Sequence, residues 1–111
     1  MKLFSLYETP FEPISHDPQL KKKVLARNTL PHIKHISHAS FPPGSTVSEH
    51  SHSDGAEVFY CIRGKAAFFI NGQRAVIMEG HLLIIEPGEL HSISEIREET
   101  ELLYFYTEYE K

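Results

Sequence analysis

Apolar residues follow a two-residue period, the period of a β-strand, through most of the chain. From residue 57 to 63, one set of alternate side chains is Glu57, Phe59, Cys61 and Arg63, and the other is Val58, Tyr60 and Ile62. Residues 65–78 read KAAFFINGQRAVIM, in which Asn71-Gly72 between two apolar runs favours a β-hairpin. No segment of useful length has the helical period. The pattern predicts an antiparallel all-β protein.

The length and composition of the chain indicate a single globular domain. The chain has 111 residues, of which 41% are hydrophobic and 23% charged. A net charge of −4, with Lys21-Lys22-Lys23 as the one basic cluster, argues against nucleic-acid binding. The apolar runs are too short for a membrane span or a signal peptide. The single cysteine excludes an internal disulfide, so we expect a cytoplasmic protein.

Residues 44–64, GSTVSEHSHSDGAEVFYCIRG, concentrate the candidate chemistry. His50 and His52 are two residues apart, so an extended strand puts both imidazoles on one face, roughly 7 Å apart at the backbone. Ser53-Asp54-Gly55 is a turn signal that can bring Glu57 beside them on the neighbouring strand. Two imidazole nitrogens and a carboxylate oxygen suit iron, nickel, copper, zinc or manganese.

A further strand can complete this site. Residues 80–91, GHLLIIEPGELH, give a buried apolar run, a Pro87-Gly88 turn and His91 at the start of the next strand. We predict one divalent transition metal ion per chain, with His91 as the fourth ligand. The other histidines do not repeat this spacing: the period of three at His32, His35 and His38 alternates faces in a strand, and His16 and His81 have no partner at ligand spacing.

These residues resemble the two motifs of the cupins, a family of small β-barrel proteins. The first motif is matched by Gly44, His50, His52, Glu57 and Gly64, and the second by Gly80, Gly88 and His91. Glu86 stands where the first proline of the second motif is usual, and Glu95 where its asparagine is usual. The resemblance implies a single antiparallel β-barrel, the double-stranded β-helix or jelly roll, and a dimer whose subunits often exchange N-terminal segments.

Parity on the strands predicts the lining of a pocket beside the metal. Phe59 and Cys61 share the face of Glu57 and form pocket walls, although Cys61 as a reactive thiol is an alternative. Ile93 and Glu95 share the face of His91. A second carboxylate at Glu95 would act as a general base or hold His91 in place; alternatively, it lies at the rim and points to water.

The N-terminal residues are expected to form a separate arm. Residues 1–18 carry five bulky apolar residues broken by Pro10, Pro13 and Pro18, which exclude a long helix. Residues 21–27 favour a short strand, with a helical turn as the alternative. We divide the chain into an N-terminal arm and edge strand, residues 1–28, which packs on the barrel or on a partner subunit, and a β-barrel, residues 29–111. A mobile tail is the alternative for the arm.

The C-terminal segment, ELLYFYTEY at residues 101–109, is apolar on both faces of the predicted strand. One face carries Leu102, Tyr104 and Tyr106, and the other carries Leu103, Phe105 and Tyr109. Because a small barrel has one core, only one face can be buried inside it. We expect the other face to meet a second subunit in a homodimer.

Four protein ligands on an octahedral ion would leave two positions open for a small-molecule substrate. The first hypothesis is therefore a metal-dependent enzyme on a small organic substrate, a dioxygenase-like oxidoreductase in which Glu57 or Glu95 takes a proton. This rests partly on the resemblance, and the same ligands in cupins also serve isomerases, cyclases and decarboxylases. The alternatives are a non-catalytic module that binds a sugar, acid or aromatic ligand, and a metal that only ties strands together.

Overall fold

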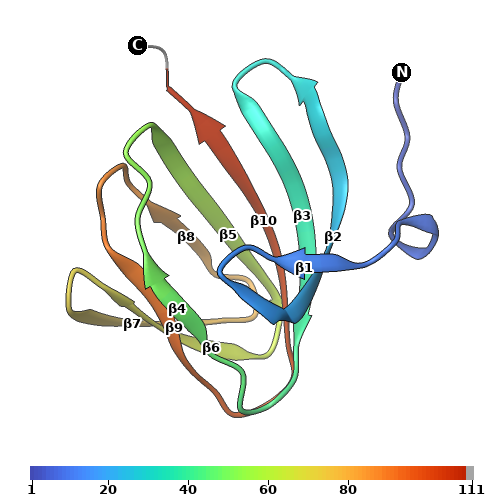
Figure 1. The fold of residues 1–111 in the computed structure, drawn as a ribbon. Coiled ribbons are helices and arrows are strands. Elements are labelled where there is room, and N and C mark those ends of the chain that lie inside the picture. The colour runs from blue at the N-terminus through green and yellow to red at the C-terminus, as the bar shows by residue number, and fades with distance from the viewer. Residues whose placement is uncertain (110–111) are drawn as a thin grey trace.

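The computed structural model describes residues 1–109, and it consists of two antiparallel β-sheets that face each other (Figure 1). The six-stranded sheet has the order β1-β2-β3-β10-β5-β8, and the four-stranded sheet has the order β4-β9-β6-β7. In chain order the elements are a 3-10 helix η1 (Leu6–Glu8), β1 (Glu12–Ile14), β2 (Asp17–Leu30), β3 (Ile33–Phe41), β4 (Val47–His50), β5 (Gly55–Arg63), β6 (Lys65–Ile70), β7 (Gln73–Met78), β8 (Leu82–Ile85), β9 (His91–Ile96) and β10 (Thr100–Glu108).

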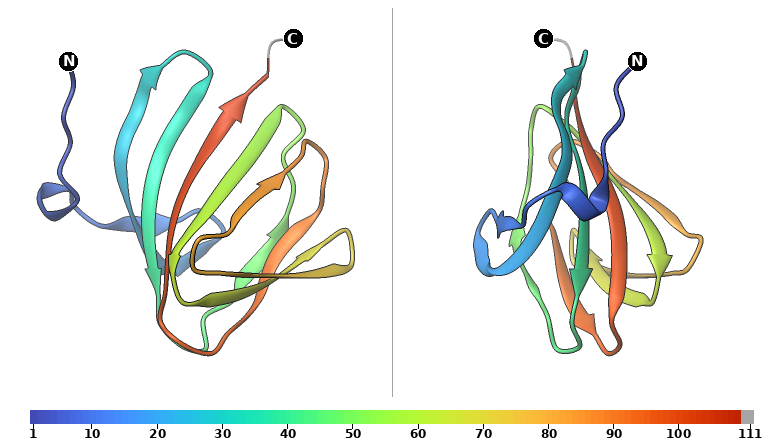
Figure 2. Two further views of the ribbon diagram at one scale, coloured as in Figure 1. Left: turned by 180° about the vertical axis from the view of Figure 1, so that it is seen from behind. Right: turned by 90° about the vertical axis from the view of Figure 1, so that its right-hand side faces the viewer.

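This arrangement confirms the all-β jelly roll, with one difference from the expected barrel. Within residues 1–109, strand pairing does not join the two sheets into a closed cylinder (Figure 2). The sheets meet through turns and side chains instead. On one side the Gly80 N–H donates to the Cys61 carbonyl at 2.9 Å, and on the other the Asp17 carboxylate accepts hydrogen bonds from Ser48.

The hairpin predicted at Asn71-Gly72 is confirmed, because β6 pairs with β7 across these two residues. Both have positive φ, 50° and 78°, as a tight turn between twisted strands requires. This hairpin forms one edge of the four-stranded sheet, and its partner β9 carries His91.

The core lies between the two sheets and follows the alternation in the sequence. Phe68 and Leu102 are fully buried, and in β10 the inward residues Tyr104 and Tyr106 are 7% and 5% exposed. The outward residues of β10, Leu103 and Phe105, are only partly covered. The prediction that one face of this strand enters the core is confirmed.

The N-terminal part of the chain joins the six-stranded sheet. Residues 21–27 lie within β2, which confirms the predicted strand, and β2 continues through residue 28 to Leu30. Residues 1–11 run beside β2, where Lys23 donates a hydrogen bond to the Leu6 carbonyl (Figure 1). Most of their apolar side chains are exposed, namely Met1, Leu3, Phe4, Tyr7 and Phe11. Packing of this arm on a partner subunit stays a prediction. Among residues 1–109 there is no helix with the length and apolar character that crossing a membrane requires.

Candidate metal centre

Four side chains predicted as ligands converge at one point of the structure. Each of His50, His52, Glu57 and His91 offers one ligand atom, and these four atoms lie within 4.8 Å of one another. His50 and His91 face each other across the β4–β9 pair, with ring centroids 4.2 Å apart. The His52 ring lies 5.2 Å from that of His50 and 5.8 Å from that of His91. This geometry could hold a single metal ion.

The elements that supply these residues differ in one respect from the sequence-based expectation. Glu57 is on β5 of the six-stranded sheet, whereas His50 is at the end of β4 in the four-stranded sheet. The two strands are therefore opposite each other rather than neighbours in one sheet. His52 lies beyond the end of β4, in the connection to β5. Glu57 thus reaches the histidines across the interior, which a turn signal alone does not reveal.

Backbone carbonyls fix the orientation of two of the imidazoles. The Nδ1 atom of His50 lies 2.8 Å from the Ser48 carbonyl, and Nδ1 of His91 lies 2.9 Å from the Glu89 carbonyl. Because a carbonyl oxygen only accepts hydrogen bonds, each Nδ1 carries the proton. In the neutral ring the lone pair of each Nε2 is then directed to the centre of the cluster, as in histidines that ligate metals, whereas protonated His91 donates from Nε2 to Glu57.

Glu57 is the acidic member of the cluster and is 8% exposed. Its Oε1 lies 3.2 Å from Nε2 of His91 and 3.9 Å from Nε2 of His52. Burial lowers the pKa of His91, but hydrogen bonds to Glu57 and to the Glu89 carbonyl outweigh it and raise that pKa overall. Burial lowers the pKa of His52, which favours its neutral, metal-binding form. A buried carboxylate whose partners here are imidazoles fits a divalent cation.

A glycine sets the position of Glu57 on β5. A Cβ at Gly55 would lie 1.7 Å from the carbonyl oxygen of Thr107 on β10, so only glycine permits this approach of the two strands. The pairing places Gly55 opposite Glu108 and Glu57 opposite Tyr106. Close contact at Gly55 therefore fixes the register that brings the Glu57 carboxylate to the histidines.

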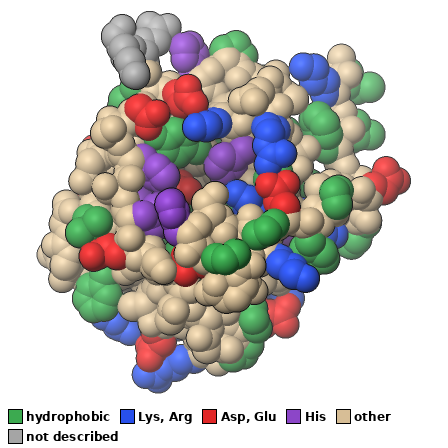
Figure 3. Space-filling view, in the orientation of Figure 1, with side chains coloured by type: hydrophobic (Ala, Val, Ile, Leu, Met, Phe, Trp, Pro, Cys, Tyr) green, Lys and Arg blue, Asp and Glu red, His purple; other side chains and the backbone are tan. Residues whose placement is uncertain are grey.

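The cluster forms part of the wall of a cavity of about 380 Å³ between the sheets. Figure 3 looks at this face of the molecule, where histidine side chains gather near the middle with basic side chains beside them. Phe59 and Ile93, both predicted as pocket residues, line the cavity. Cys61 faces inward as predicted, but it is fully buried in the core and does not belong to the lining.

Glu95 does not lie near the candidate metal ligands, although strand alternation had placed it on the face of His91. Phe68 on β6 pairs with Ile93, and the preceding Ala67 pairs with Glu95, so β9 has a bulge at Ser94. The bulge shifts the inward positions from Ile93 to Ile96, which is 2% exposed. Glu95 is instead 3.2 Å from Arg97 and 3.6 Å from Arg74, outside the cavity lining.

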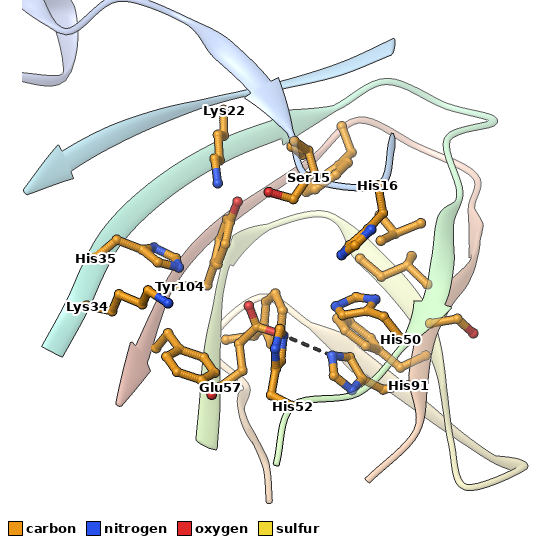
Figure 4. A pocket seen from close by; sticks show the side chains of 18 of the residues that line it. Ser15, His16, Lys22, Lys34, His35, His50, His52, Glu57, His91 and Tyr104 are labelled. Carbon is orange, nitrogen blue, oxygen red and sulfur yellow. Dashed lines mark hydrogen bonds and ion pairs between the residues drawn. The ribbon is translucent and has the colours of Figure 1, made fainter. Parts of the chain in front are cut away.

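Several residues of the cavity were not assigned to it from the sequence. His16 and Lys22 come from the β1–β2 hairpin, His35 comes from β3, and Tyr104 comes from β10 (Figure 4). The alternation in residues 101–109 placed Tyr104 with Leu102 and Tyr106 on one face of the strand, but it did not say which face is inward, so the signal was incomplete. The hairpin residues gave none, because their place depends on how the hairpin lies over the opening between the sheets.

Residues 37–106 match the family model of the cupin domain. The chain is a cupin. Over 52 residues it is 38% identical to an oxalate-binding protein of Thermotoga maritima, a match that covers 47% of this chain and 43% of that protein, less than half of its length. Activities and ligands of such relatives therefore enter below only as proposals.

Solved cupin structures share the fold over nearly the whole chain. One is a predicted oxalate decarboxylase of Thermotoga maritima, with a TM-score of 0.84, 24% identity and coverage of 97% of this chain and 100% of that one. KdgF from Halomonas sp. gives a TM-score of 0.81 at 14% identity, covering 100% of this chain and 96% of that one. An RmlC-like cupin from Shewanella frigidimarina gives a TM-score of 0.79 at 20% identity, covering 100% of this chain and 95% of that one. At these identities the likeness concerns the fold alone.

Proposed function

We propose that this cupin is a metal-dependent enzyme that acts on a small organic acid. The observation that carries the proposal is the convergence of three imidazoles and one buried carboxylate on the wall of a cavity of about 380 Å³. A closed structural site would have no reason to face such a space. The relative named as an oxalate-binding protein supports an organic acid as the ligand class.

The chain supplies the groups that such a reaction needs. When bound, a divalent metal would polarise a chelating acid at its open coordination positions. Glu57 belongs to the cluster, with its Oε1 3.2 Å from Nε2 of His91, and its carboxylate can accept a proton from the bound molecule. Phe59 and Ile93 give the cavity an apolar wall that orients the carbon skeleton of the ligand and excludes water. Dioxygenase chemistry and decarboxylation both fit this arrangement.

A second candidate function is a non-catalytic module that binds the same class of acid. The name of the Thermotoga relative, an oxalate-binding protein, favours this alternative. The metal and the cavity would then serve recognition alone, and the bound acid would leave unchanged.

One experiment separates the two functions. Protein loaded with Fe²⁺ or Mn²⁺ is titrated with oxalate by calorimetry and then incubated with oxalate and 2-hydroxy acids, with and without O₂, while CO₂ release and O₂ uptake are followed. Turnover supports the enzyme, and binding without turnover supports the module. Absence of binding to any of these acids overturns both. His91→Ala is the inactive variant, and His38→Gln is its matched control, because His38 on β3 lies outside the cavity lining and contacts Glu101 instead.

We also propose that the outer face of the six-stranded sheet pairs with a second copy of the chain. Two apolar rows run across β8, β5 and β10 on this face. In the first row Tyr60 pairs with Leu82 and Leu103. In the second row Val58 pairs with Ile84 and Phe105. Tyr60, Leu82 and Ile84 are 42%, 59% and 55% exposed. An exposed apolar sheet face can pack against the same face of a second copy, as in a two-fold interface.

A further inference from the structure

Away from the candidate histidine ligands, the six-stranded sheet that also carries Glu57 presents a second group of polar side chains to the cavity. Lys22, His35 and Tyr104 line the same cavity as the four candidate ligands. Tyr106 pairs with His35 on one side and with Glu57 on the other. His35 therefore lies two strand spacings, about 10 Å, across the sheet from Glu57. Figure 4 shows the polar ends of Lys22, Ser15 and Tyr104 directed toward one another, away from the cluster of histidines.

Lys22 is the one of these residues that carries a charge: burial lowers the pKa of its ammonium and the nearby Glu12 carboxylate raises it, but within residues 1–109 no carboxylate is in direct contact with it. Within residues 1–109, its Nζ makes no hydrogen bond or ion pair. Glu12, opposite Lys22 in the β1–β2 pair, holds Arg27 instead, with 2.6 Å between Oε1 and Nη2. Lys34, the other lysine of the lining, lies 3.8 Å from Glu108. A half-buried ammonium without a partner favours an anionic ligand.

The neighbours of Lys22 are neutral hydrogen-bonding groups. Burial raises the pKa of Tyr104, so its hydroxyl stays protonated and can donate a hydrogen bond. The His35 ring packs edge-on against Tyr104, with centroids 5.7 Å apart, and its Nδ1 lies 2.8 Å from the Ser37 hydroxyl. Burial lowers the pKa of His35, which favours the neutral ring. One unpaired cation beside neutral donors matches a carboxylate better than a doubly charged phosphate.

We propose that Lys22 and Tyr104 bind the distal carboxylate of a diacid whose other end chelates the metal. This inference rests on the proposed function, and it extends it by naming the substrate class: a diacid long enough to span the cavity rather than oxalate. A cavity of about 380 Å³ has room for such a molecule beside the metal ligands. The β1–β2 hairpin, which lies outside the matched cupin domain, would then determine specificity.

The test compares matched pairs of ligands on metal-loaded protein by calorimetry. The diacids are 2-hydroxysuccinate, 2-hydroxyglutarate and 2-hydroxyadipate, and each is paired with the 2-hydroxy monoacid of the same length. We expect at least one diacid to bind about tenfold more tightly than its monoacid. Lys22→Met should abolish this difference and leave the monoacid affinity and the metal content unchanged. Lys21→Met, at the exposed neighbouring position, is the control and should keep the difference.

The outcomes separate this inference from the proposed function. Equal binding of diacids and monoacids, or an unchanged preference in Lys22→Met, overturns the carboxylate site and leaves the metal-dependent acid binding intact. Tighter binding of 2-hydroxy-3-phosphopropanoate than of every diacid overturns the assignment to a carboxylate. Failure of all the hydroxy acids to bind metal-loaded protein overturns both proposals.

Discussion

Asp17 and Ser48 connect the N-terminal hairpin to the strand that carries His50. The two carboxylate oxygens of Asp17 accept hydrogen bonds from the backbone N–H of Ser48 at 3.0 Å and from its hydroxyl at 2.8 Å. The carbonyl of the same Ser48 accepts a hydrogen bond from Nδ1 of His50. A continuous chain of hydrogen bonds thus runs from β2 to a candidate metal ligand, and it holds the β1–β2 hairpin over the cavity.

Removal of this connection should lower stability. Asp17 is 4% exposed, and its hydrogen bonds are made by a charged acceptor. We expect Asp17→Ala to reduce the free energy of unfolding by about 2 kcal/mol, measured by urea denaturation. Glu49→Ala, at an exposed position on the same β4 strand, is the control. Equal midpoints for the two variants would mean that the Asp17–Ser48 contact does not hold the hairpin.

Gly55 should be required for the candidate metal site as well as for the fold. A Cβ there would overlap the Thr107 carbonyl, so Gly55→Ala must push β5 away from β10 and displace Glu57. We expect a loss of about 2–3 kcal/mol in stability and weaker metal binding. Gly72→Ala meets open space at a φ of +78°, so it should cost about 1 kcal/mol and leave metal binding unchanged. Calorimetric metal titration of both variants checks this, and full metal affinity in Gly55→Ala would contradict it.

Cys61 should be unreactive in the folded protein. The side chain is fully buried, and burial raises the pKa of its thiol further than the nearby Arg63 carbonyl lowers it. Because the thiolate is the reactive form, a raised pKa lowers the reactive fraction at every pH below it. We expect labelling by a disulfide reagent at pH 8 to be about 100-fold slower in native than in guanidinium-unfolded protein. Rapid labelling of native protein would show a reactive thiol instead.

If the outer face of the six-stranded sheet forms the proposed dimer, a single charged residue introduced there should dissociate it. Ile84→Lys places an ammonium on β8, the edge strand of the sheet, within the exposed apolar face. Light scattering after size exclusion should then show twice the chain mass for the wild type and one chain mass for the variant. Phe69→Lys changes an exposed apolar residue of the four-stranded sheet and should remain dimeric. A wild-type protein of one chain mass would exclude this dimer.

The sequence indicated the strands, the Asn71-Gly72 hairpin and the four residues that converge, because these depend on local period and spacing. The sequence could not indicate that Glu57 reaches the histidines from the opposite sheet. That depends on β4 and β5, which are joined by the turn, entering different sheets. Glu95 shows the limit of parity: a single extra residue, Ser94, reverses the direction of everything after it.

The residues of the far wall of the cavity could not be predicted from local sequence patterns, for a related reason. Lys22 belongs to a run of three lysines that is indistinguishable from a solvated strand, and only the tertiary position of the β1–β2 hairpin turns one of them inward. Cys61 points inward as the alternation predicted, but its position along β5 places it in the packed core rather than in the cavity. Period gives the face of a strand, and packing decides what that face meets.

Elemental analysis of untagged protein, purified without chelator, tests the central claim most directly. Wild-type protein and His38→Gln should contain about one divalent transition metal ion per chain, whereas His91→Ala and Glu57→Gln should contain almost none. Circular dichroism of each sample shows whether a loss of metal follows from the ligand or from unfolding. A folded wild-type protein that is free of metal and takes up no Fe²⁺, Mn²⁺, Ni²⁺, Cu²⁺ or Zn²⁺ would contradict the account.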